Sequence, residues 1–272
     1  MSIPSSSERA QHNLVSMQHI YKTFNPDTVS EVTVFQDFNL DIPRGQFVSV
    51  IGSNGSGKTT MLNLLCGSIP IDMGAIYLGG KTLKGLKEYQ RAGKIGRVFQ
   101  DPSRGTCPEL TILENMALAD NKGKVFGLGR GVNRRRMDEY RTQLERLKLG
   151  LEDKMDIPVG SLSGGQRQAL ALLISTMTPI ELLILDEHTA ALDPNSSATV
   201  MELTDQIVKE KNLTALMVTH NLKFAVQYGN RLLMMHQGRA VIDAADAEKE
   251  KLQMNDILEK FNTISLELGN SL

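Results

Sequence analysis

Apolar residues along this chain form short continuous runs separated by longer stretches with helical spacing. Residues 47–51 are a nearly unbroken apolar and β-branched run, as expected of a strand buried on both faces of a parallel sheet. Residues 182–185 and 214–218 are further runs of this kind. Stretches after residues 60, 163 and 194 show helical spacing instead. The pattern therefore predicts an α/β fold with a mainly parallel core sheet.

The segment before residue 47 follows a period of two. From residue 32 to residue 42 apolar side chains recur on even positions, and Gln36 interrupts the alternation. These residues are Val32, Val34, Phe38, Leu40 and Ile42. Such alternation predicts a half-buried antiparallel strand, which we expect to pair with residues 14–24 across an Asn-Pro-Asp turn. An antiparallel β subdomain should therefore accompany the core sheet.

Residues 101–165 change character and predict an inserted helical subdomain. Thr111 and Glu114 form a capping box that opens one helix, and apolar residues at 137, 140, 144 and 147 mark a second helix that Gly150 closes. Between these helices the basic residues are Lys122, Lys124, Arg130, Arg134, Arg135 and Arg136. This basic loop, residues 122–136, is interpreted either as solvated surface or as a contact with anionic lipid headgroups.

The two ends of the chain differ from its middle. Residues 1–13 are polar and serine-rich without the apolar core of a secretory signal, which predicts a flexible N-terminal tail. Residues 14–244 hold all the strand and helix patterns described so far, and we expect them to form the main domain. Residues 245–272 begin with charges and continue at helical spacing, which predicts a C-terminal helical extension.

Composition narrows the class of protein. The chain has 272 residues, of which 41% are hydrophobic, so it can bury a substantial core. Its net charge of −1 argues against a general nucleic-acid binder, which would carry a basic excess. Two cysteines do not make a disulfide framework, and no apolar window is long enough to span a membrane.

The most informative motif lies between the strand at 47–51 and the helix that follows it. It consists of Gly52, Ser53, Asn54, Gly55, Ser56, Gly57, Lys58, Thr59 and Thr60. The motif matches the P-loop pattern G-x-x-x-x-G-K-[ST], whose glycines let backbone N–H groups surround an anion at a helix N-terminus. A nucleotide triphosphate is the expected ligand, with Lys58 on its β- and γ-phosphates and the Thr59 hydroxyl on Mg²⁺.

Two further strands end in polar residues. The run at 182–185 leads into Asp186 and Glu187, and the run at 214–218 leads into Thr219 and His220. Parallel strands present functional groups at their carboxyl ends, so these side chains should face the same crevice as the P-loop. Asp186 can hold Mg²⁺ through water, and Glu187 can accept a proton from an attacking water. His220 is a candidate phosphate contact.

Three other features admit both a structural and a functional interpretation. Ser163 and Gln166 form a capping box, and the two glycines between them leave the helix N-terminus open to a phosphate. Gln100 lies where a short strand meets a loop, where it could equally be a turn former. Phe24 ends the first strand, either as part of the core or as a stacking platform for a base.

In this order, the motifs resemble those of the ATP-binding subunit of ABC transporters over residues 14–243. The most specific element is the signature Leu162, Ser163, Gly164, Gly165 and Gln166, which other P-loop proteins lack. The resemblance implies a P-loop NTPase of the ABC ATPase type that forms a head-to-tail dimer with a second copy of itself. Two ATP molecules would lie between the P-loop of one chain and the signature of the other, where Ser163 and Gly165 contact the γ-phosphate.

The resemblance also implies roles for single residues outside the P-loop and the signature. Phe24 would stack on adenine, and Gln100 would sense Mg²⁺ and couple to the membrane subunit. Asp193 would link the two sites across the dimer, and His220 would hold the γ-phosphate. Asp186 and Glu187 would keep the roles that their position already indicates.

One residue departs from the family pattern: His188 stands where the family usually has proline. The strings at 96–102, 186–193 and 228–236 resemble a bacterial branch whose genes accompany a substrate-binding lipoprotein and a permease. Amino-acid uptake is suggested for parts of that branch. The expected protein is therefore an importer ATPase on the cytoplasmic face of the membrane, bound to permease subunits and served indirectly by an extracytoplasmic substrate-binding protein.

Other P-loop classes fit the sequence less well. A soluble ABC-type ATPase that acts on nucleic acid or ribosomes would carry a long coiled-coil insertion or two cassettes, and 272 residues with one P-loop fit neither. A GTPase would need Asn-Lys-x-Asp, whereas residues 121–124 read Asn-Lys-Gly-Lys. A small-molecule kinase would leave the signature unexplained.

Overall fold

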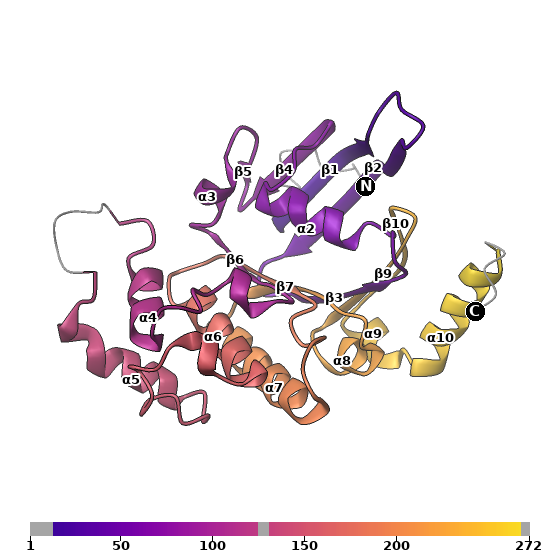
Figure 1. The fold of residues 1–272 in the computed structure, drawn as a ribbon. Helices are drawn as coiled ribbons and strands as arrows, with labels where there is room; N and C mark the ends of the chain where they lie inside the picture. The colour runs from indigo at the N-terminus through magenta and orange to yellow at the C-terminus, as the bar shows by residue number, and fades with distance from the viewer. Residues whose placement is uncertain (1–12, 125–130, 268–272) are drawn as a thin grey trace. The chain divides into compact units, whose positions relative to one another are not determined.

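The computed structural model describes residues 13–124 and 131–267, which Figure 1 shows as a ribbon. The chain divides into two compact units. Unit 1 comprises Met1–Glu88 and Thr214–Leu272, and unit 2 comprises Tyr89–Leu213. All but one residue of the predicted N-terminal tail lies outside the described residues, and so does part of the basic loop.

An antiparallel sheet forms one layer of unit 1. Its strands are β1 (Asn13–Phe24), β2 (Val32–Pro43), β4 (Met73–Leu78) and β5 (Lys81–Thr82), in the order β2-β1-β4-β5. The pairing of β1 with β2 is antiparallel, as the period of two predicts. The predicted antiparallel β subdomain is therefore confirmed.

The inward face of β2 changes phase within the strand. Lys22 of β1 lies opposite Phe35, and Ile20 lies opposite Phe38, so three steps along β2 match two steps along β1. The extra residue forms a bulge, and Asp37 has a positive φ of 59°. Phe35 is consequently buried, whereas Val32 is 55% exposed. The prediction that even positions face inward holds beyond the bulge but is wrong at Val32.

A second group of strands in unit 1 has the order β10, β9, β3, β8. These strands are β3 (Phe47–Gly52), β8 (Thr214–Val218), β9 (Arg231–His236) and β10 (Arg239–Ala245). β3 pairs in parallel with β8 and with β9, and β10 is antiparallel to β9. Every residue of β3 is buried, which agrees with its continuous apolar run.

The described residues of unit 1 also form the helices α2 (Lys58–Cys66), α8 (Leu222–Gln227), α9 (Ala247–Lys251) and α10 (Met254–Glu267). α2 ends at Gly67, whose left-handed φ of 82° and N–H bond to the Asn63 oxygen agree with the predicted C-terminal glycine. Ile257 of α10 is fully buried in a cluster with Ile51 and Leu232. The C-terminal extension therefore docks on the core of its own unit.

Unit 2 contains a parallel pair of strands and four of the described α-helices. The strands are β6 (Ile95–Val98) and β7 (Leu182–Asp186), and the helices are α4 (Ile112–Asp120), α5 (Met137–Glu145), α6 (Gly164–Thr176) and α7 (Pro194–Glu210). Short 3₁₀ turns occur at Pro102–Arg104, Arg134–Arg136 and Val159–Ser161, and the short helix α3 (Glu88–Arg91) spans the unit boundary. The unit is larger than the insert expected at 101–165, because it also includes β6, most of α6, β7 and α7.

Both capping boxes that the sequence predicts are present in unit 2. Thr111 accepts from the Glu114 N–H at the start of α4, and Ser163 accepts from the Gln166 N–H at the start of α6. α5 ends at Glu145, earlier than predicted, and the chain reaches Gly150 through a non-helical turn. Leu147 is nevertheless buried, as its apolar spacing indicates.

Candidate functional site

The P-loop joins β3 to α2 in unit 1, and its shape depends on glycine. Gly52 has a φ of 150°, and a Cβ there would lie 2.2 Å from the Met235 backbone oxygen. Gly57 has a left-handed φ of 101°, and its Cβ would lie 3.0 Å from the Phe35 ring. A side chain at Gly52 would overlap the backbone at Met235, and one at Gly57 would crowd the Phe35 ring and force a left-handed φ on a residue with a Cβ. The backbone therefore reaches its course only with glycine at both positions.

Lys58 lies inside the P-loop and is only 5% exposed. Its Nζ donates to the Gly52 oxygen over 2.7 Å and to the Ser53 oxygen over 2.9 Å. The ammonium group thus holds the two ends of the loop together and places one positive charge at the N-terminus of α2. Thr59, the next residue, is exposed. An anion in this loop would meet backbone N–H groups, a helix N-terminus and a cation together.

β2 runs from the P-loop towards Phe24. Val34 Cγ1 lies 3.2 Å from the position that a Gly57 Cβ would occupy, and Val32, two residues away, pairs with Phe24. The Phe24 ring is half-buried, and Lys22 Nζ lies 5.3 Å from its centroid. The ring is therefore not a buried core residue.

A cavity of about 650 Å³ adjoins this part of unit 1. It is lined by Val32, Thr33, Val34, Gln36, Gly55, His236, Gln237, Gly238, Arg239 and Val241. These residues come from β2, the tip of the P-loop and the β9–β10 hairpin. The cavity therefore opens beside the predicted phosphate loop.

His220 is exposed directly after β8. Val218 of β8 lies opposite Val50 of β3, so two further residues along each parallel strand lead to His220 and Gly52. The Thr219 N–H donates to the Val50 oxygen over 3.1 Å and continues this ladder. Unit 1 therefore places His220 and the P-loop at the carboxyl ends of neighbouring strands, as the sequence predicts.

In unit 2 the predicted acidic pair lies at the end of β7. Asp186 is the last residue of the strand, and Arg97 of β6 donates from Nη2 to its Oδ2 over 2.6 Å. Glu187 follows with a left-handed φ of 49° and a half-buried side chain. A positive φ is uncommon for a residue other than glycine, and it marks the point where the strand ends. Arg97 was missed by the sequence analysis, because only the pairing of β6 with β7 brings it to Asp186.

The N-terminus of α6 carries the signature residues of unit 2. Ser163 and Gly164 are exposed, and the Ser163 N–H donates to Gln166 Oε1 over 3.2 Å. A Cβ at Gly165 would lie 2.9 Å from the Ser196 Cβ at the start of α7. Gly165 is therefore also needed for the two helix starts to pack, a requirement that the motif alone does not reveal.

Asp193 and Gln100 occupy exposed positions at the ends of elements in unit 2. Asp193 caps α7 by accepting from the Asn195 and Ser196 N–H groups at 3.1 and 3.0 Å. Hydrogen bonds from Ser196 hold the pKa of Asp193 below its usual value, so the cap is charged at neutral pH. Gln100 lies two residues beyond the end of β6.

His188 is buried in unit 2 with 2% of its surface exposed. Its Nε2 lies 3.2 Å from Thr204 Oγ1, and that hydroxyl donates to the Val200 oxygen over 2.7 Å. Because the hydroxyl proton is used in that bond, the hydroxyl can only accept a hydrogen bond from His188. Nε2 therefore carries the proton of a neutral imidazole ring. Burial lowers the pKa of His188 to about 4, which agrees with the neutral form. The residue that departs from the family pattern is therefore a packed structural histidine.

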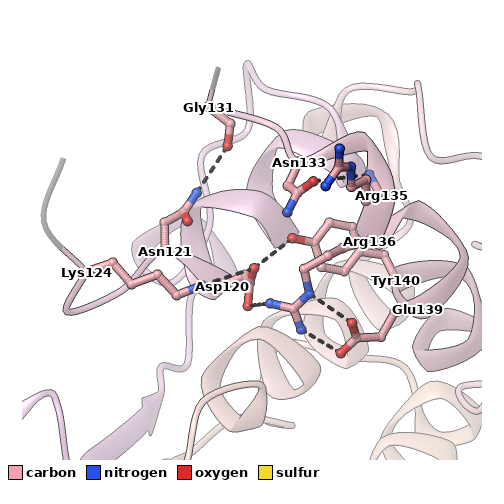
Figure 2. A network of polar contacts seen from close by, with 9 residues as sticks. All are labelled: Asp120, Asn121, Lys124, Gly131, Asn133, Arg135, Arg136, Glu139 and Tyr140. Atoms are coloured by element: carbon pink, nitrogen blue, oxygen red, sulfur yellow. Dashed lines mark hydrogen bonds and ion pairs between the residues drawn. The ribbon is translucent and has the colours of Figure 1, made fainter. Parts of the chain in front are cut away.

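Polar contacts tie down both ends of the basic loop (Figure 2). Arg136 pairs with Asp120 and, over 2.5 Å, with Glu139. The Tyr140 hydroxyl donates to Asp120 over 3.0 Å, and Lys124 lies 3.4 Å from the same carboxylate. Burial and the Asp120 hydrogen bond raise the pKa of Tyr140 to about 12. Arg136 is therefore neutralised by its own subunit.

Two arginines of the basic loop, Arg134 and Arg135, are exposed. The lipid-headgroup hypothesis now rests on them, on the exposed Lys122 and on Arg130, which lies outside the described residues, as do all of residues 125–130. None of the helices within residues 13–124 and 131–267 has the length and apolar character of a membrane span. The same ranges contain no cluster of three His, Cys, Asp or Glu side chains suited to a metal.

Comparison with known proteins extends these findings. A family model described as "ABC transporter" matches residues 35–190. The "Tyrosine transport ATP-binding protein" of Clostridioides difficile is 49% identical over 248 residues, which is 91% of this chain and 98% of that protein. The "Phosphonates import ATP-binding protein PhnC" of Lactococcus lactis is 30% identical over 258 residues, or 91% of this chain and 99% of that protein.

Solved structures show the same fold. A dimeric ATP-binding cassette in a post-hydrolysis state with ADP and phosphate matches with a TM-score of 0.71 and 28% sequence identity. The match covers 85% of this chain and 98% of that one. A nucleotide-free cassette from an ABC transporter matches with a TM-score of 0.77 over 95% of this chain, at 23% identity.

Proposed function

Because the chain belongs to the ABC transporter family and is an ATPase cassette of it, we propose that it drives uptake by a bacterial importer as a dimer bound to permease subunits. The cassette would act from the cytoplasmic face of the membrane. Two relatives with transport or import in their names, each matched over nearly its whole length, support this proposal. No feature of the chain favours action on nucleic acid or ribosomes instead.

The nucleotide would bind in unit 1. Lys58 is the cation for the β- and γ-phosphates, and the P-loop N–H groups complete their cradle. Val34 and Val32 lead from the P-loop towards Phe24 with the spacing of two strand residues, about 7 Å. That reach suits a ribose between the phosphates and a base. Phe24 would stack on the adenine with its exposed part.

Magnesium fits the donor types at these positions. The expected ligands are the Thr59 hydroxyl, the Asp186 carboxylate and the Gln100 amide oxygen, all hard oxygen donors. Mg²⁺ in such sites takes one or two protein ligands and completes its shell with water and phosphate oxygens, so a dense acidic cluster is unnecessary. When bound, the ion would neutralise charge on the β- and γ-phosphates.

Hydrolysis would assign separate tasks to four residues. Glu187, whose side chain is half-buried at the end of β7, would accept the proton of the attacking water. His220 would donate to the γ-phosphate from the carboxyl end of β8. Lys58 would stabilise charge on the same phosphate, and Gln100 would report the state of the site to the permease.

The observation that carries the proposal is the exposed N-terminus of α6. Ser163 Oγ accepts from the Gln166 N–H and can still donate its own proton, and Gly164 beside it is exposed. The exposed start of this 13-residue helix can bind a phosphate, although no P-loop leads into the helix. We assign it, with Ser163, Gly164, Gly165 and Gln166, to the ATP held by the P-loop of a second copy, and Asp193 to the link between the two sites.

Gel filtration of two variants tests this assignment. Glu187→Gln keeps the shape of the side chain but cannot accept a proton, so ATP should persist and hold two chains together as a dimer that ADP does not support. Adding Ser163→Arg should leave ATP binding to the P-loop intact and yield a monomer. A dimer that survives Ser163→Arg, or that forms equally without nucleotide, would contradict the shared site.

The cargo is a separate question, because an ATPase subunit does not touch it. We propose tyrosine or a chemically similar amino acid, since the relative at 49% identity is named for tyrosine transport. An extracytoplasmic substrate-binding protein would deliver it. Uptake of labelled tyrosine by cells with and without the intact gene tests this, and equal uptake would direct attention to another substrate.

A further inference from the structure

An ion pair that no motif predicts lies at the carboxyl end of β7. Arg97 of β6 lies opposite Ile184 of β7, and Asp186 follows two residues later on the same face. Arg97 Nη2 therefore reaches Asp186 Oδ2 at 2.6 Å. The side chains of Arg97 and Asp186 are 10% and 16% exposed. A charged hydrogen bond in so sheltered a place is stronger than one on the surface.

The remainder of Arg97 is also held in place. Its guanidinium carbon lies 4.7 Å from the centroid of the Phe99 ring. The Ser175 hydroxyl donates to the Arg97 backbone oxygen over 3.1 Å, and Gln168 Nε2 donates to the Phe99 oxygen over 2.9 Å. The guanidinium thus stacks on the Phe99 ring, and side chains of α6 hold the backbone of residues 97 and 99 in place. Such an arginine can impose an orientation on the carboxylate that it contacts.

We propose that Arg97 is a positioning residue that orients the Asp186 carboxylate for the magnesium ion of bound ATP. The inference rests on the proposed function, in which Asp186 is the magnesium carboxylate. The hydrogen bond engages Oδ2, and a carboxylate has a second oxygen, Oδ1, with which to hold a metal or its water. Without Arg97 the carboxylate would lose its sheltered partner and rotate, and the metal site would lose a pre-set oxygen.

The direction in which the Mg²⁺ requirement changes distinguishes a positioning arginine from one that competes with the metal. An arginine that merely competed with Mg²⁺ for Asp186 would, when removed, lower the Mg²⁺ concentration that the protein requires. A positioning arginine would, when removed, raise it. Loss of a residue that orients a metal ligand weakens metal affinity by about 10- to 100-fold in other proteins.

Arg104 supplies a matched control. Its guanidinium carbon also lies 4.7 Å from the Phe99 centroid, so it shares the stacking partner of Arg97. In the part of the chain that the structure describes, it is Arg97 and not Arg104 that bonds to Asp186. Replacing Arg104 therefore perturbs the same ring and leaves the carboxylate contact in place.

The experiment measures binding of a fluorescent, non-hydrolysable ATP analogue to the full chain, in EDTA and at increasing Mg²⁺. Arg97→Gln should raise the half-saturating Mg²⁺ concentration about tenfold or more and leave the affinity in EDTA unchanged. Arg97→Lys should recover part of the shift because it keeps the charge. Arg104→Gln should behave as wild type, and the melting temperature of each nucleotide-free variant shows whether it is folded.

Each outcome decides the matter. An unchanged or lower Mg²⁺ requirement in Arg97→Gln overturns the inference, and so does an equal loss of affinity in EDTA, which would indicate a structural role. If Arg97→Gln does not fold, the same criteria apply to Arg97→Lys, with a smaller upward shift expected. Asp186→Asn distinguishes a failure of the magnesium assignment from a failure of the role of Arg97. If it leaves the Mg²⁺ requirement unchanged, the magnesium assignment fails, whereas a shift in Asp186→Asn without one in Arg97→Gln removes only the role of Arg97.

Discussion

Lys249 of α9 should make the stability of the fold rise with pH in the alkaline range. The side chain is buried, with 5% of its surface exposed, and Nζ donates to the backbone oxygens of Tyr228 and Gly229. Burial lowers its pKa from 10.5 to about 8. Between these two values the unfolded chain binds a proton that the folded chain has released. Folding is therefore favoured as pH rises from 8 to 10.5, and the gain is absent below pH 8.

The pKa difference sets the size of the effect. At about 1.4 kcal/mol per pKa unit, the drop from 10.5 to about 8 corresponds to about 3 kcal/mol. This value is an upper limit, because the two carbonyl hydrogen bonds favour the charged ammonium and work against burial.

Urea unfolding at pH 7, 8.5 and 10 measures the free energy of unfolding of the wild type and of Lys249→Met, in which residue 249 cannot titrate. The wild type minus variant difference in unfolding free energy should grow with pH, by up to about 3 kcal/mol. Lys251→Met, at an exposed position of the same helix, should keep the pH dependence of the wild type. A difference for Lys249→Met that stays level or shrinks as pH rises would refute the reasoning.

Three further changes test the nucleotide site and the packing of the signature. Lys58→Ala should abolish ATP hydrolysis and weaken binding, since no other cation of the motif offsets the phosphate charge; near-normal phosphate release would overturn the P-loop assignment. Phe24→Ala should weaken ATP binding by about 1–3 kcal/mol if the ring stacks on adenine, and unchanged affinity in a titration, with a lower melting temperature, would leave the ring only a packing role. Gly165→Ala should destabilise the fold by about 1–3 kcal/mol in urea, because its Cβ would lie 2.9 Å from that of Ser196; Ser196→Gly should restore part of the loss, and a Gly165→Ala protein as stable as wild type would contradict the contact.

Much of the fold follows from local patterns in the sequence. The apolar run at 47–51 lies within β3, the P-loop leads into α2 at Lys58, and Gly67 ends that helix in the left-handed region. Both capping boxes form as expected because their partners are three residues apart and need no tertiary contact to meet. The ATPase family follows from the same local information, since the P-loop, the signature and the acidic strand end are each short contiguous strings.

The exceptions in the fold arise where a strand or helix departs from its regular period. The bulge at Asp37 reverses the inward face of β2, and a pattern of apolar residues cannot show that one residue has been added to a ladder. α5 stops before Leu147, although that residue is buried as if the helix continued. Burial of a side chain follows from its apolar character, whereas the backbone that carries it depends on the surrounding packing.

What only the tertiary structure decided is which distant residues meet. Arg97 and Asp186 are 89 residues apart and come together through the register of β6 against β7. The contact of His188 with Thr204 and that of Lys249 with the backbone oxygens just after α8 likewise join residues that are distant along the chain. The sequence by itself determined the elements, the phosphate loop and the family, because these depend on neighbours along the chain. The contacts that set charge and orientation around Asp186 depend on strand register and helix packing. Register and packing arise from many residues far apart along the chain, so no single position in the sequence reveals them.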